Sequence, residues 1–235
     1  TGNFAITIGG NFSVGAGGTF TVGSSRVTFT GAATGTSDIT PGGDAFYDLE
    51  VAAGGNSARL QESITVNRDV ILTSGTLNAN NLNISVARNW TNTAGSLTAG
   101  TGTVSFITAA AAVISGSTTF NNFSCSVAGK TLQFTAGTAQ TINGSFSIQG
   151  AAGNLISLVS SASPTQWTIN NVGAENVDYA LVRDGAVLGT DISADSSRND
   201  GNNDTTSPGW IFTPTTITWD GSSSIDWNTA ANWNV

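Results

Sequence analysis

The sequence predicts an all-β protein, specifically a right-handed parallel β-helix (β-solenoid) built from a repeat of about 76 residues. Three observations predict it. Apolar residues alternate with small polar ones along most of the chain, Gly-containing turns separate these stretches, and long phrases return later in the sequence. A repeat favours stacked units, because each unit must cover the apolar face of the next. Tandem β-sandwich modules are the alternative, since a unit of this length could close one sandwich.

The repeat is visible in two matching phrases, "GTFTVGSSRVTF" at 18–29 and "GSLTAGTGTVSF" at 95–106, which lie 77 residues apart (95 − 18). Upstream, "NFAITIGGNF" matches "NLNISVARNW" at an offset of 78 (81 − 3), and downstream "VNRDVIL" matches "INGSFSI" at 76 (142 − 66). We therefore expect a β-solenoid body over 1–150 that holds two copies, at about 3–78 and 81–150.

Within each copy the strands are predicted by alternation, and the turns by glycine. The first strand of each copy carries its apolar residues two apart, at Phe4, Ile6 and Ile8 and at Leu82, Ile84 and Val86. The phrases "GAGG", "TSG", "TAGTG" and "VAGK" supply the turns, where glycine accepts a positive φ. No segment combines a 3.6-residue apolar spacing with strong helix formers, so we expect no helix.

Asparagine and cysteine at matched positions receive structural interpretations. Asn11 aligns with Asn89 and Asn67 aligns with Asn143, which predicts Asn side chains stacked at the corners of the solenoid. Cys125 is the single cysteine, so it cannot form an internal disulfide. It aligns with an apolar position of the first copy and is expected to be a small core residue.

The repeat fades after residue 150. We expect irregular end rungs over 151–212, including an Asp/Asn-rich loop, and a Trp-rich C-terminal extension over 213–235. Three of the six tryptophans, Trp219, Trp227 and Trp233, lie in this extension. Because an uncovered solenoid end must be capped or paired, the extension is expected to cap the stack or dock on a neighbour. Ring stacking on a sugar is the alternative.

Composition and charge argue against several functions. A net charge of −8 with seven basic residues argues against nucleic acid as a partner. No apolar run reaches membrane-spanning length, so no membrane insertion is expected. The chain has no histidine, and no Asp or Glu lies between Asp69 and Glu175, so the paired carboxylates of a glycosidase are missing there. We therefore expect a protein that is not an enzyme.

The Asp/Asn-rich loop offers the one candidate for metal chemistry. Asp195, Asp200 and Asp204 supply hard oxygen ligands of the kind that Ca²⁺ prefers, although their spacing does not match an EF-hand loop. A solvated turn, in which Asp and Asn bind their own backbone, is the other interpretation. No other cofactor is expected.

The phrase "VNRDVILTSGTLNANNLNISVARNWTNTAGSLTAGTGTVSF" resembles the repeat modules of large bacterial extracellular β-solenoid, adhesin-like surface proteins. The phrases "DSSRNDGNNDTTSPGWIF" and "ITWDGSSSIDWNTAANWN" resemble the module-end and module-start phrases of the same class. The resemblance implies an extracellular, cell-surface protein. In that class the second phrase usually opens a module, which implies that both ends of this chain meet another copy.

These features lead to an expected function: an extracellular structural subunit of a bacterial surface fibre or filament, assembling head to tail through its terminal strands. The expected partners are copies of itself or neighbouring modules of the same polypeptide. The expected interface residues are Phe4, Ile6 and Ile8 at one end and Trp219, Trp227 and Trp233 at the other. The alternative is an adhesin or carbohydrate-binding module that contacts glycans through the Trp cluster or the Thr-rich faces.

Overall fold

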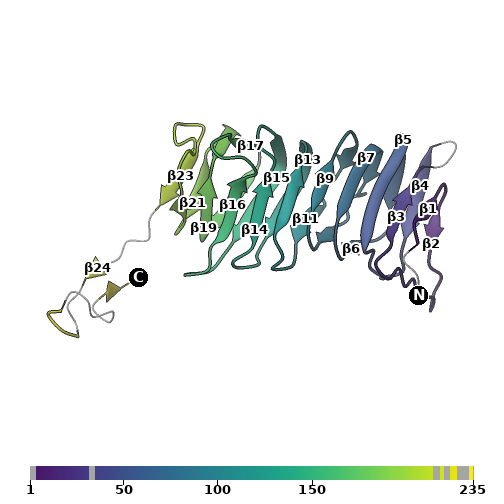
Figure 1. Ribbon diagram of the computed structural model, residues 1–235, viewed down its shortest axis with the longest axis horizontal. Coiled ribbons are helices and arrows are strands. Elements are labelled where there is room, and N and C mark those ends of the chain that lie inside the picture. Colours follow the sequence, from purple (N-terminus) through teal and green to yellow (C-terminus); the bar gives the residue numbers. More distant parts are fainter. Residues whose placement is uncertain (1–3, 32–34, 214–217, 220–222, 227–232, 235) are drawn as a thin grey trace.

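The computed structural model is a solenoid of parallel β-strands stacked in about ten turns, which confirms the predicted fold class (Figure 1). The structure describes every residue except 1–3, 32–34, 214–217, 220–222, 227–232 and 235. The described residues form no helix, and therefore no helix that could cross a membrane.

Each turn of the solenoid passes through three faces in a fixed order, as the strand registers show. The first face is formed by β1 (Ile6–Ile8), β3 (Arg26–Phe29), β5 (Asp48–Leu60), β7 (Val70–Asn78), β9 (Trp90–Asn92), β12 (Ala112–Ser115), β14 (Thr131–Phe134), β16 (Ile156–Ser160), β19 (Ala180–Arg183) and β22 (Arg198–Asn199).

The second face is formed by β2 (Phe12–Ser13), β4 (Thr36–Thr40), the ends of β5 and β7, β10 (Ser96–Thr98), the beginnings of β13 (Thr118–Cys125) and β15 (Ala139–Gln149), β17 (Trp167–Asn171) and β20 (Gly185–Gly189). The third face is formed by β6 (Ile64–Val66), β8 (Ile84–Val86), β11 (Thr103–Phe106), the ends of β13 and β15, β18 (Ala174–Asp178), β21 (Ile192–Asp195) and β23 (Trp210–Thr213). A separate antiparallel pair joins β24 (Thr218–Trp219) to β25 (Trp233–Asn234).

The stacking unit is a single turn, which is shorter than the repeat found in the sequence. On the first face, partners in neighbouring turns lie between 17 residues apart (Leu181 and Arg198) and 26 residues apart (Leu132 and Leu158). The turns after residue 150 continue the same stack through β16 to β23.

Residues matched by the sequence repeat lie on different faces. Val27 lies on the first face in β3, whereas its match Val104 lies on the third face in β11. Three turns lead from Val27 through Leu49 and Val70 to Trp90, and Val104 lies two faces further on. The offset of 77 therefore spans three and two-thirds turns. It relates inward positions that have the same apolar character on all three faces.

The interior is a continuous apolar core in which aromatic rings of successive turns pack together. The Phe123 ring is fully buried, with its centroid 5.2 Å from that of Phe106, 5.3 Å from Phe120 and 5.7 Å from Phe146. Cys125 is buried in the same strand, as the sequence predicts. Close packing of this kind makes the core sensitive to any lost volume.

Short polar side chains close the corners by binding the backbone of the next turn. Between the third and first faces, the Asp48 carboxylate accepts a hydrogen bond from the Asp69 N–H at 3.2 Å. The Asp69 carboxylate then accepts from the Asn89 N–H at 3.1 Å, and the Asn89 side chain from the Val113 N–H at 2.9 Å. This ladder satisfies donors that the bend in the chain would otherwise leave unpaired.

The predicted role of asparagine at corners holds for two of the four matched residues. Asn11 accepts a hydrogen bond from the Asp38 N–H at 2.9 Å, as Asn89 does from its own neighbour. The bonds run to the backbone of the next turn rather than between stacked asparagines. Asn67 and Asn143 are exposed, and their side chains bind no other group of the described chain.

We predict that Phe123→Ala lowers the free energy of unfolding by about 3–5 kcal/mol, because the substitution leaves a cavity among rings that cannot collapse into it. Urea denaturation followed by circular dichroism measures the change. Ser124→Ala, which alters the outward-facing neighbour, should change the free energy by no more than about 0.5 kcal/mol. Equal effects of the two substitutions would contradict the assignment of inward and outward positions.

Candidate assembly ends

The N-terminal end of the stack has free strand edges. Among the described strands, β1 pairs only with β3 and β2 pairs only with β4. The Ile8 carbonyl accepts a hydrogen bond from the Thr30 N–H at 3.0 Å, so the peptide groups of Ile8 face into the stack. Because these groups alternate along a strand, the N–H and C=O of Thr7 face outward from the end. A neighbouring strand could bind them.

The apolar residues of this end are only partly covered. Ile6 and Ile8 point into the solenoid above Val27 and Phe29, their register partners, and remain half-buried. Phe12 and Phe20 are also half-buried, with ring centroids 4.9 Å apart. The last turn of the described core therefore presents an apolar surface that another turn could cover.

Phe4, the third residue predicted at this end, lies differently from the two isoleucines. It precedes β1 and is 71% exposed, while its N–H donates to the Ser25 hydroxyl at 3.0 Å. Together with Ala5, Ser24 and Arg26, these residues line an open hollow of about 310 Å³ at the N-terminal edge. The structure thus brings Phe4, Ile6 and Ile8 to the same end, with only the isoleucines in the core.

The C-terminal end has free edges on the same three faces. Within the described chain, β22 pairs only with β19, β20 only with β17 and β23 only with β21. The Asp200 N–H donates to the Val182 carbonyl at 2.8 Å, so the peptide groups of Asn199 face outward from this end. Leu188 and Ile211 leave large exposed side chains on the outer surface of the same turn.

The two ends are complementary in backbone polarity. Throughout the stack, peptide groups of inward-pointing residues face the C-terminal end, as the Ile114 carbonyl does when it accepts from the Thr135 N–H. Peptide groups of outward-pointing residues face the N-terminal end. The free groups at the C-terminal end therefore belong to inward positions such as Asn199, and those at the N-terminal end to outward positions such as Thr7. This is the relation that joins successive turns inside the protein.

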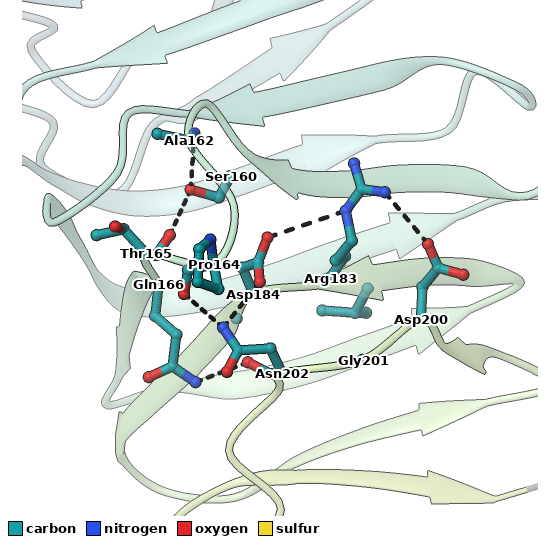
Figure 2. A network of polar contacts seen from close by, with 12 residues as sticks. Ser160, Ala162, Pro164, Thr165, Gln166, Arg183, Asp184, Asp200, Gly201 and Asn202 are labelled. Carbon is teal, nitrogen blue, oxygen red and sulfur yellow. Dashed lines mark hydrogen bonds and ion pairs between the residues drawn. The ribbon is translucent and has the colours of Figure 1, made fainter.

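A polar network fixes the loop that follows β22 (Figure 2). Asp184 is fully buried, and the Asn202 amide donates to its carboxylate at 2.8 Å and to the Pro164 carbonyl at 2.6 Å. Arg183 lies between two carboxylates, at 3.9 Å from Asp184 and 3.6 Å from Asp200. The network holds the Asp/Asn-rich loop on the end turn and leaves its edge strands open.

The three carboxylates proposed as calcium ligands are held by different partners. Asp200 pairs with Arg198 and Arg183, Asp204 accepts from the backbone and hydroxyl of Thr206, and Asp195 accepts from the Thr213 hydroxyl. The structure does not bring the three together. Across the described residues, no group of three or more His, Cys, Asp or Glu side chains could hold a metal. The loop matches the alternative of a turn bound to itself.

The predicted Trp-rich extension contains a short antiparallel pair. Trp219 of β24 is the register partner of Trp233 of β25, and the Trp219 side chain is partly exposed. Trp227 lies outside the described residues. In Figure 1 this pair stands apart from β23 rather than over the end of the stack.

Lys130 has a role that the sequence did not reveal. Its side chain is fully buried, and its ammonium group donates to the carbonyls of Thr108 at 2.8 Å, Ala110 at 2.5 Å and Ala87 at 3.3 Å. The ammonium lies 5.8 Å from the Phe106 ring centroid. Burial lowers the pKa of Lys130. The only hint in the sequence was that Lys130 and Arg88 are the sole charged residues between positions 70 and 174.

Comparisons of the chain with protein-family models, with curated proteins and with solved structures find no match. The argument for function therefore rests on the geometry of the ends and faces, together with the resemblance of the sequence phrases.

We predict that Lys130→Met lowers the free energy of unfolding by about 1–3 kcal/mol, because it fills the same space but removes the donor from three buried carbonyls. Arg88→Met removes an exposed cation from the same region and should change stability by no more than about 0.5 kcal/mol. Chemical denaturation of the two variants at neutral pH provides the comparison. A Lys130→Met variant as stable as the parent would show that the ammonium is not needed in the corner.

We predict that Cys125 makes stability fall with rising pH in alkaline solution. Burial raises the pKa of its thiol above the ordinary value of 9.0, so the unfolded chain loses this proton first. Fewer bound protons in the unfolded state mean a falling free energy of unfolding, by up to about 1.4 kcal/mol per pH unit.

Lys130 acts in the opposite direction, because its lowered pKa makes the folded state release its proton first as pH rises toward 10.5. The test is therefore the difference between the parent and Cys125→Ala, measured by denaturation from pH 7 to pH 10. The variant should lack the thiol contribution to the alkaline decline. Parallel pH profiles for the two proteins would contradict the prediction.

Proposed function

We propose that this protein is an extracellular structural subunit of a bacterial surface fibre or filament, which assembles head to tail through its terminal strands. Its partners are copies of itself or neighbouring modules of the same polypeptide. The observation that supports the proposal most strongly is the match between the two ends, where the same three faces are open and the free backbone groups have opposite, complementary facing.

The geometry of the proposed joint follows from the register inside the stack. A second copy would place its β1 on β22, its β2 on β20 and its residues 20–22 on β23. Asn199 would then take Ile6 or Ile8 as its register partner, since all three occupy inward positions. The outward-facing N–H of Thr7 could donate to the Asn199 carbonyl when Ile6 is that partner. Such strand addition combines backbone hydrogen bonds with burial of alternate side chains.

Burial of the partly covered apolar residues would favour this joint. Ile6, Ile8, Phe12 and Phe20 each retain exposed surface at the N-terminal end. Covering apolar surface contributes roughly 25 cal/mol per Å². The outer faces between the ends are poor in charge, with hydroxyl and amide groups in its place. That composition fits a structural role better than an enzymatic one, while the extracellular location is inferred from the resemblance of the sequence phrases.

The second candidate is an adhesin or carbohydrate-binding module of a longer surface protein. One specific observation favours it, a neutral groove on the second face. The predicted sugar-binding role of the Trp cluster has weaker support, because only part of that cluster lies among the described residues.

We predict that the purified chain forms fibres at neutral pH, with an axial repeat of about 50 Å, since the ten first-face strands are spaced about 4.8 Å apart. Thr7→Pro should prevent fibre formation, because it removes the outward N–H of β1 while proline is tolerated in an edge strand. Thr7→Val keeps the donor and should preserve the fibres. Negative-stain electron microscopy distinguishes these outcomes, and circular dichroism checks that both variants fold.

Two results would contradict the proposal: monodisperse particles of the parent protein, or unchanged fibres of Thr7→Pro. A deletion of 214–235 shows separately whether the Trp-rich extension takes part, since edge-strand docking alone should survive it. Loss of fibres in a calcium chelator would instead assign a metal to the joint.

A further inference from the structure

The ladders of the solenoid are interrupted at one place on the second face. On the described first and third faces, each named strand pairs with the next from end to end. On the second face, β10 pairs only with β7, and the beginning of β13 pairs only with β15. The edges of β10 and β13 therefore meet in the middle of the stack without a ladder.

A change in corner geometry accounts for the interruption. The chain needs the four residues 99–102 to pass from β10 to β11, whereas β13 turns the equivalent corner within a single strand at Asn121. A bulge lies at the same corner, because the β13–β15 register shifts between Phe120 and Asn122. There Asn121 lies opposite two residues, Asn143 and Gly144. Bulges of this kind re-aim side chains.

The interruption opens a groove of about 240 Å³ on the outer surface. Leu97 and Phe120 contribute its apolar floor, and Thr98, Thr119, Asn121 and Asn143 contribute polar side chains around it. None of these four polar side chains forms a hydrogen bond with another described residue. Each amide can donate and accept, and so can each hydroxyl. Unengaged groups of both kinds thus converge on one hollow.

We propose that this groove binds a neutral saccharide, at the scale of one sugar residue. Hydroxyl-rich ligands need donors and acceptors together, which the two amides and two hydroxyls supply. No charged residue lines the groove, so it offers nothing to an anionic or cationic ligand. The site is independent of the two ends, so it does not rest on filament assembly.

The size and setting of the groove favour a sugar over a peptide strand. Its volume lies below the range of about 300–1,000 Å³ that is usual for drug-sized ligands. A strand inserted between β10 and β13 would need about twice the 4.8 Å strand spacing. These two strands instead remain in direct contact along the groove. A single sugar ring can lie over Leu97 and bind the polar groups around it without separating the strands.

The test is saturation-transfer NMR of the full chain with the methyl glycosides of glucose, galactose, mannose and N-acetylglucosamine. Each is used at about 10 mM, which would occupy a millimolar site. The method detects sugar protons on a single chain and on a fibre alike, so its outcome does not depend on assembly. At least one glycoside should receive saturation from the protein.

Asn143→Ala should weaken that binding about fivefold to tenfold, the effect of losing hydrogen bonds from one amide. Thr119→Val should also weaken it. Both side chains are exposed, so neither variant should unfold the protein. Asn67→Ala is the matched control, because Asn67 is another exposed asparagine with no hydrogen-bonded side chain, and it should leave binding unchanged. Absence of transfer to all four glycosides, or equal transfer in Asn143→Ala and Thr119→Val, would overturn the proposal.

Discussion

The parallel backbone ladder between successive turns is the constraint on which the rest of the structure depends. It requires each turn to place its inward residues above those of the turn before, so the core becomes a continuous column of apolar side chains. It also directs the peptide groups of inward residues toward the C-terminal end, as Ile114 shows with Thr135. The ends follow from the same rule, because the first and last described turns have a ladder on one side only.

The sequence predicted the strands and the solenoid because alternation and glycine turns are local signals. It did not predict the length of a turn, because corners take different numbers of residues and the offset varies from 17 to 26. The similarity of inward positions on all faces made a longer offset, such as that between Val27 and Val104, look like the repeat. Cys125 was predicted correctly from its apolar match, whereas Lys130 was not predicted, because its carbonyl partners come from earlier turns.

The candidate site residues were predictable to the extent that they depend on local sequence. Ile6 and Ile8 could be placed at an edge because alternation fixes which side of a strand is inward. The carboxylates of Asp195 and Asp200 could not be assigned from spacing, because neighbouring arginine and threonine side chains bind them first. Asn143 shows the limit of matching positions, since a bulge turns its side chain away from the corner bond formed by its counterparts.

Assembly and ligand binding place different demands on a solenoid. A stack whose ladders are complete buries its backbone donors and acceptors, so strand addition is confined to the two ends. Small-ligand recognition needs side chains that the ladders and corners leave unengaged, and these appear where one corner type gives way to another, beside Asn121. A fibre built through Thr7 and Asn199 would therefore keep the second-face groove open in every subunit and repeat it along its length. Many weak sugar contacts would then act together, which raises avidity without any stronger single site.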